Sequence, residues 1–256
     1  MGRPSAGGVQ AAGSALAGRV RGGQQPVSGA YIELFAVGAS GYGSAAATLL
    51  TSGAQTGSDG SFDITADYIC PSPSTLVYLT ATGGNPGLSG NVNNSALTLM
   101  AALGPCGALQ SATFLNVNEL TTVAGVWALS HYMTGRSAIG SSATNSTGIA
   151  RAFAAANEVV NLATGTTPGA SPPSGATLPV TKLNSLANIL AACVNSAGGV
   201  AGDGSACGNL FAAATPAGGS APVDTIGAAI NIARNPGSNV GTVFGLASAN
   251  GRSSLR

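Results

Sequence analysis

The chain has 256 residues, of which 45% are hydrophobic and only 7% are charged. Soluble domains ordinarily carry about 25% charged residues, so small neutral polar groups and backbone must cover this surface. The sequence contains no basic cluster, which removes the electrostatic basis for nucleic-acid binding. It also contains no apolar run of about 18 residues, so we expect no membrane span.

The formal net charge of +1 leaves little repulsion between copies of the chain. Because charge repulsion normally keeps soluble proteins apart, a surface this neutral favours association. Two interpretations stay open: a protein that packs against copies of itself, or an exported monomer that is simply rich in small residues.

Residues 1–15 are rich in Gly, Ala and Ser and show no periodicity. We interpret them as a flexible or extended arm in front of the folded part of the chain. The arm positions that we expect to take part in assembly are Gly7, Val9, Ala11 and Ala15.

Residues 16–84 contain short strand patterns separated by turn signals. Residues 30–37 alternate, with Tyr31, Glu33 and Phe35 on one face and the residues between them on the other. Further strands are expected around residues 18–20 and over 48–56, 61–65 and 75–82. The strand over 61–65 directly follows the turn predicted at Asp59-Gly60. Five or more short strands predict an antiparallel sandwich.

The segments "GRVRGGQQPVSGAYIELFAVG", "TGSDGSFDIT" and "TLVYLTATGG" lie in this region. Their pattern resembles the carboxypeptidase-regulatory-like family of Ig-like domains, also called transthyretin-like or CnaB-like. The resemblance implies an Ig-like β-sandwich over 16–84 that serves as a spacer, adhesion or assembly module. Many CnaB-like members carry a Lys–Asn isopeptide crosslink, which this segment cannot form because Lys182 is the first lysine of the chain.

From about residue 85 the hydrophobic period changes to that of helices. Asn, Pro and Gly residues at the segment ends supply caps and stops. We predict helices over 93–104, 116–133, 146–165, 180–196, 205–215, 222–235 and 238–249, with a proline-rich loop over 166–179. The fold class predicted is therefore multi-domain, with an N-terminal antiparallel Ig-like β-sandwich and a C-terminal all-α domain over 85–256.

The order of a sandwich followed by helices, with segments such as "NVNELTTVAGVWAL" and "GGVAGDGSACGNLFAAAT", is similar to a group of secreted bacterial proteins. That resemblance implies an exported, non-catalytic surface protein.

The four cysteines fall into two local pairs, Cys70 with Cys106 and Cys193 with Cys207. A disulfide across the Gly- and Ser-rich segment of the second pair would remove about 3 kcal/mol of unfolded-state entropy. Zinc binding and free buried thiols are the alternatives, although no Cys-x-x-Cys spacing occurs. Two disulfides imply an oxidising compartment, so we expect an extracellular or cell-surface location.

The sequence offers few groups for catalysis or metal binding. Its single histidine, His131, lies near the end of the helix predicted over 116–133, where it can stabilise the helix dipole. Asp59, Asp63 and Asp67 are spaced by four and form an incomplete calcium set, and a hairpin turn stabilised by Asp59 explains the same residues. We therefore predict no catalytic residues, no metal site and no cofactor.

The leading hypothesis is an exported structural protein that assembles with itself into a homopolymer such as a filament. The arm of one copy would add as a strand to an open sheet edge of the next. The alternative is an adhesin or carbohydrate-binding protein whose partners are surface glycans. The aromatic candidates for that role are Tyr42, Tyr68, Tyr78 and Trp127, although Trp127 lies on an apolar helical stripe that fits a core position.

Overall fold

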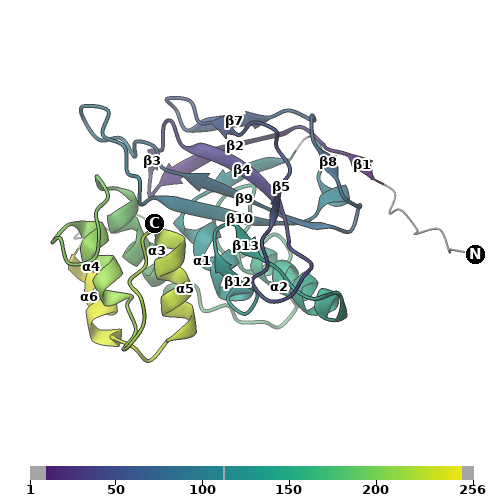
Figure 1. The fold of residues 1–256 in the computed structure, drawn as a ribbon. Helices are drawn as coiled ribbons and strands as arrows, with labels where there is room; N and C mark the ends of the chain where they lie inside the picture. Colours follow the sequence, from purple (N-terminus) through teal and green to yellow (C-terminus); the bar gives the residue numbers. More distant parts are fainter. Residues whose placement is uncertain (1–9, 112, 250–256) are drawn as a thin grey trace, which may run out of the picture.

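The computed structural model describes residues 10–111 and 113–249. In this part of the chain two β-sheets lie one on the other, and α-helices cover the outer face of the larger sheet (Figure 1). Two short sheets and two short 3-10 helices, η1 (Cys106–Ala108) and η2 (Ala143–Asn145), complete the fold. The described chain is therefore built of both strands and helices.

The larger sheet is antiparallel. Its strand order is β10 (Thr98–Pro105), β9 (Leu76–Thr82) and β4 (Tyr31–Ala36), and the short strands β5 (Ala47–Thr48) and β6 (Ala54–Gln55) both pair with β4. In the smaller sheet β2 (Leu16–Gly22) lies between β7 (Ser61–Ile64) and β11 (Phe114–Val117), and β3 (Gln25–Pro26) closes a hairpin with β2. The β2–β11 pair is parallel, unlike the others.

Strand β4 shows how the alternation of the sequence divides the core. Ile32 and Leu34 are fully buried between the two sheets. Phe35 points to the opposite face, where its ring stacks on Tyr78 with centroids 5.3 Å apart in the core shared with the helices. The predicted alternation over residues 30–37 is confirmed, because successive side chains of a strand point to opposite faces.

The helices form the third layer. They are α1 (Glu119–Leu129), α2 (Ser146–Val159), α3 (Val180–Val194), α4 (Ala206–Ala213), α5 (Thr225–Arg234) and α6 (Val240–Ala249). Helix α1 is buried on almost every side and contacts β10 and the helices α2, α3 and α5. Asn118 starts it with a capping box, in which its side chain accepts from the Thr121 amide and the Thr121 hydroxyl accepts from the Asn118 amide.

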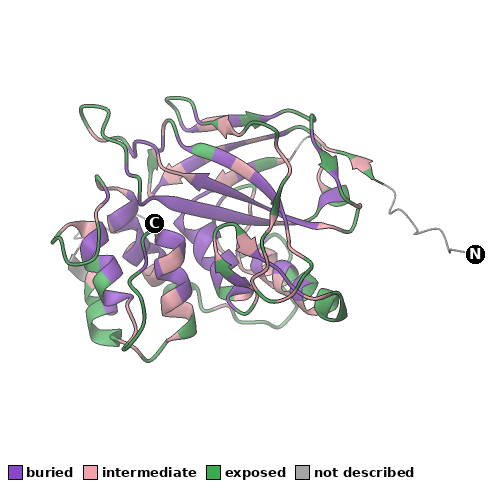
Figure 2. Cartoon of the chain, in the orientation of Figure 1, coloured by how far each residue is buried: buried purple, intermediate pink, exposed green. Residues whose placement is uncertain are grey.

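One predicted helix is wrong. Residues 98–104, which lie within the helix expected over 93–104, belong instead to the strand β10, which pairs with β9. Its residues are buried on both faces, between the smaller sheet on one side and the helices on the other, as the purple strands of Figure 2 show. A short run of Leu, Met and Ala is compatible with a helix or a buried strand, and tertiary contacts chose the strand.

Strands also continue beyond residue 84. Both β10 and β11 join sheets whose other strands come from residues 16–82, and β12 (Met133–Gly135) pairs with β13 (Ala138–Ile139). Residues 85–256 are therefore not all-helical. The predicted boundary between residues 84 and 85 runs between two paired strands, β9 and β10.

Both predicted cysteine pairs are disulfides in the structure. Cys70–Cys106 links β8 (Ile69–Cys70) to the 3-10 helix η1 after β10, and Cys193–Cys207 links the end of α3 to α4. One disulfide therefore fastens the strands and the other fastens the helices.

Candidate functional site

The described end of the N-terminal arm is docked on its own chain. Strand β1 (Ala11–Ala12) pairs antiparallel with β8, and the Gly13 amide donates to the Tyr68 carbonyl at 2.8 Å. The Tyr68 hydroxyl donates to the Ser14 carbonyl at 3.0 Å. Of the two forms expected for the arm, flexible or extended, residues 11–14 show the extended one, and main-chain bonds hold them in place.

The other predicted assembly positions are placed differently. Ala15 is exposed between β1 and β2. Gly7 and Val9 lie outside the described residues. Sequence periodicity could not reveal the docking, since it depends on a two-residue strand that pairs with residues more than fifty positions away.

Two sheet edges are closed by other parts of the chain. At β10 the Thr98 amide donates to the Thr225 hydroxyl at 2.9 Å, and the Met100 amide donates to the Thr122 hydroxyl, also at 2.9 Å. At β11 the Asn116 amide donates to the Leu162 carbonyl at 2.8 Å. Neither edge presents a row of free amides to another chain.

The opposite edges are short. Strands β5 and β6 contain two residues each, and β7 contains four residues with Asp63 exposed among them. Short strands and edge charges both discourage pairing with another chain. Strand β8 is the place where the structure shows an arm added as a strand.

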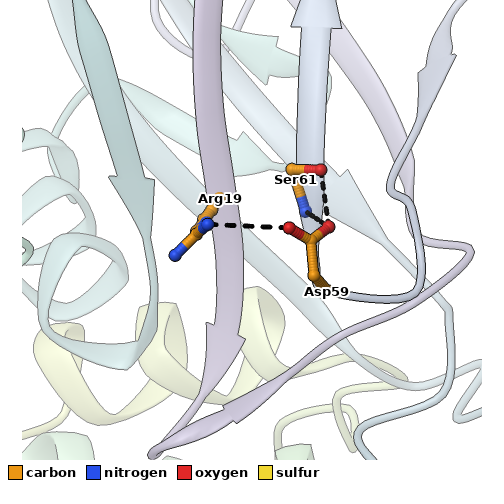
Figure 3. Close-up of polar contacts among 3 residues, drawn as sticks. All are labelled: Arg19, Asp59 and Ser61. Carbon is orange, nitrogen blue, oxygen red and sulfur yellow. Dashed lines mark hydrogen bonds and ion pairs between the residues drawn. The ribbon is translucent and has the colours of Figure 1, made fainter.

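The acidic residues considered for calcium do not come together. Asp59 accepts from both the amide and the hydroxyl of Ser61, at 3.0 and 2.6 Å, and lies 3.6 Å from the Arg19 guanidinium (Figure 3). These Ser61 hydrogen bonds hold the pKa of Asp59 below its ordinary value. Asp63 and Asp67 are exposed, and no group of three metal-ligating side chains occurs within the described residues.

His131 and the aromatic candidates occupy different environments. His131 is exposed just beyond Ser130, the residue that ends α1. Tyr68 and Tyr78 are buried and cannot serve as a platform for a sugar ring. Tyr42 is 57% exposed with the Arg234 guanidinium 5.5 Å from its ring centre, and Trp127 is 38% exposed.

Trp127 lies at a cavity between α1, α3, α5 and α6. The cavity has a volume of about 630 Å³ and is lined mostly by apolar side chains, including Val126, Leu186, Ile189 and Phe244. Lys182 also lines it and places its ammonium group 4.7 Å from the centre of the Trp127 ring. The interpretation of Trp127 as a core residue is wrong, because its side chain is 38% exposed and lines this cavity.

Sequence reasoning did not single out Glu119, which is fully buried at the first position of α1. Both carboxylate oxygens accept from the Gly23 amide, at 2.9 and 3.1 Å. Burial raises the pKa of Glu119 to about 7, and the hydrogen bond from Gly23 opposes that shift. The only sequence signal was an acidic residue directly after a helix cap in a segment that is otherwise uncharged.

No protein-family model, curated protein or solved structure matches the chain. Across residues 10–111 and 113–249, no helix is both long and apolar enough to cross a membrane.

Proposed function

We propose that this chain is an exported, non-catalytic structural protein that assembles with itself by exchange of its N-terminal arm. Two disulfides support a location outside the reducing cytosol. The packing of two mainly antiparallel sheets is compatible with an Ig-like sandwich, a fold used widely as an assembly module.

The observation that carries the proposal is the pairing of β1 with β8. Residues 11–14 meet β8 and Tyr68 through a small set of main-chain and tyrosine hydrogen bonds. The same contacts form if the arm comes from a neighbouring copy, so exchange between copies loses little interaction energy. Each copy can then accept one arm and donate another, which is a head-to-tail arrangement that builds a polymer.

Exposed apolar side chains on the strands suit such a contact. Ile69 is 57% exposed on β8, and Phe114 is 42% exposed at the start of β11. The formal net charge is only +1, so electrostatic repulsion between copies is weak.

A crosslink across β1 and β8 tests the proposal. Ala12 and Ile69 are register partners. Hydrogen-bonded and non-hydrogen-bonded pairs alternate along antiparallel strands, and the next pair, Gly13–Tyr68, is hydrogen-bonded, so Ala12–Ile69 is a non-hydrogen-bonded pair. The Cα atoms of such pairs lie about 4.5 Å apart, which a disulfide can span. The double variant Ala12→Cys with Ile69→Cys is concentrated until light scattering reports assembly, then oxidised and run on a non-reducing gel.

We expect a ladder of covalent multimers that reducing agent collapses to the monomer. The matched control, Ala15→Cys with Ile69→Cys, places two exposed thiols at positions that are not register partners, and it should give no ladder. Assembled material that yields only internally crosslinked monomers, or a wild-type chain that stays monomeric at high concentration, contradicts the proposal.

A further inference from the structure

The cavity between α1, α3, α5 and α6 has no part in the assembly proposed above. From its apolar lining and from Lys182, the cation among the described residues that line it, we infer that it binds a free long-chain carboxylic acid. The acyl chain would lie among the apolar side chains, and the carboxylate would lie beside the Lys182 ammonium group.

The size and lining of the cavity suit an acyl chain. Its volume of about 630 Å³ falls within the usual range for small-molecule sites, about 300–1,000 Å³. Small side chains such as Ala229, Ala233 and Ser185 on α5 and α3 leave the space, while Val243 and Phe244 of α6 form another part of the wall. Apolar walls in contact with water are unfavourable by about 25 cal/mol per Å², so an apolar occupant gains by covering them.

Lys182 selects the head group. It is the only lysine of the sequence, and none of the described residues that line the cavity is acidic. Within the described residues the single salt bridge joins Arg19 to Asp59, so Lys182 has no carboxylate partner there. Its ammonium group lies over the Trp127 ring, and because Lys182 is exposed and Trp127 is 38% exposed, a carboxylate can approach the ammonium group from solvent.

The remaining groups do not compete for that charge. The first turn of α3, which carries Lys182, has no acidic residue and no side-chain cap. The other polar side chains of the lining, such as Asn235 and Ser238, are neutral. An anionic amphiphile therefore contacts both the apolar walls and the Lys182 ammonium group, whereas a neutral lipid leaves the ammonium group unpaired.

Trp127 gives a direct readout because it is the only tryptophan of the sequence. The experiment titrates the full-length chain with 5-doxyl-stearic acid, whose nitroxide is close to the carboxylate, below its micelle concentration and follows quenching of Trp127 fluorescence. The methyl ester of the same probe is titrated in parallel. We expect saturable quenching by the acid and about fivefold weaker binding of the ester, the size of one partly exposed ion pair.

Two variants with matched controls locate the probe. Ala233→Phe fills the cavity and should abolish saturable quenching, whereas Ala154→Phe on the exposed face of α2 should not. Lys182→Met should weaken binding of the acid about fivefold and leave that of the ester unchanged, with Arg151→Met as the control. Circular dichroism checks each fold, and the Lys182→Met and ester results decide the question even if Ala233→Phe does not fold.

Several results would overturn the inference. Absence of saturable quenching in the wild type, or its persistence in a folded Ala233→Phe variant, rules out this cavity as the site. Equal binding of acid and ester rules out a carboxylic acid as the ligand class. Quenching that appears only when residues 250–256 are removed, or only when the protein is diluted, shows that the chain itself or a second copy fills the cavity.

Discussion

Glu119 is a buried carboxyl group that forms no ion pair with any described residue. Both of its carboxylate oxygens accept from the Gly23 amide, which links the start of the helix to the β2–β3 turn. Burial penalises the charged form more than this bond stabilises it, so the pKa of Glu119 rises to about 7. Folding therefore favours the protonated acid.

The stability of the protein should consequently fall as pH rises through this range. Between the unfolded pKa near 4.5 and the folded value of about 7, the native state binds more protons than the unfolded state. A shift of that size corresponds to about 3 kcal/mol of the free energy of unfolding, fully present below pH 4.5 and lost by pH 8. Urea denaturation from pH 4 to pH 8 measures the loss.

The variant Glu119→Gln cannot ionise and should flatten this dependence, so that it is relatively more stable than the wild type at pH 8. The control Glu158→Gln, on the half-buried face of α2, should keep the wild-type slope. An unchanged slope in Glu119→Gln would show that Glu119 is not the group responsible.

At the scale of elements, the side chain of Asn94, which lies just before β10 in the chain, forms hydrogen bonds to the end of α3. Its amide donates to the Cys193 carbonyl at 2.6 Å and the Val194 carbonyl at 3.2 Å. Its carbonyl accepts from the amides of Ala96 and Leu97 at 2.9 and 3.0 Å. This fully buried side chain therefore connects the larger sheet to the helices next to the Cys193–Cys207 disulfide.

We expect Asn94→Ala to lower the free energy of unfolding by about 3 kcal/mol, because it leaves buried backbone groups of two elements without partners. Asn93→Ala, at the exposed neighbouring position, should change it by less than about 0.5 kcal/mol. Chemical denaturation of the two variants measures the difference. Equal stabilities would mean that water replaces the Asn94 amide.

At the scale of the whole molecule, the surface is nearly without ionic contacts. The sequence carries 17 formally charged residues, and the described part contains one ion pair. Salt shortens the Debye length from about 10 Å at 0.1 M to about 3 Å at 1 M. This screening changes association only where charged groups of two copies lie close together. An assembly built by strand exchange should therefore be almost indifferent to ionic strength.

Light scattering in 0.05 M and 1 M NaCl tests this expectation, and the apparent association constant should change by less than about twofold. A tenfold or larger fall at high salt would show that ion pairs hold the copies together. The Arg19→Ala variant is the matched control, since removing one side of the Arg19–Asp59 pair should leave association unchanged.

Much of the local structure could be predicted from the sequence. The alternation of Ile32 and Leu34, an asparagine cap at the start of α1 and the two cysteine pairs are all present in the structure. The candidate sites could be predicted less well. The residues around the Trp127 cavity come from four helices, and nothing in their sequence spacing shows that small side chains on α3 and α5 face each other.

The sequence by itself determined the alternating strands, the helix caps, the cysteine pairs and the uncharged surface, because these depend on periodicity, local hydrogen bonds and composition. Only the tertiary structure decided that residues 98–105 are a strand, that residues 11–14 dock on β8, and that Glu119 is buried. Each of these depends on contacts between residues far apart in the chain, which no local pattern encodes.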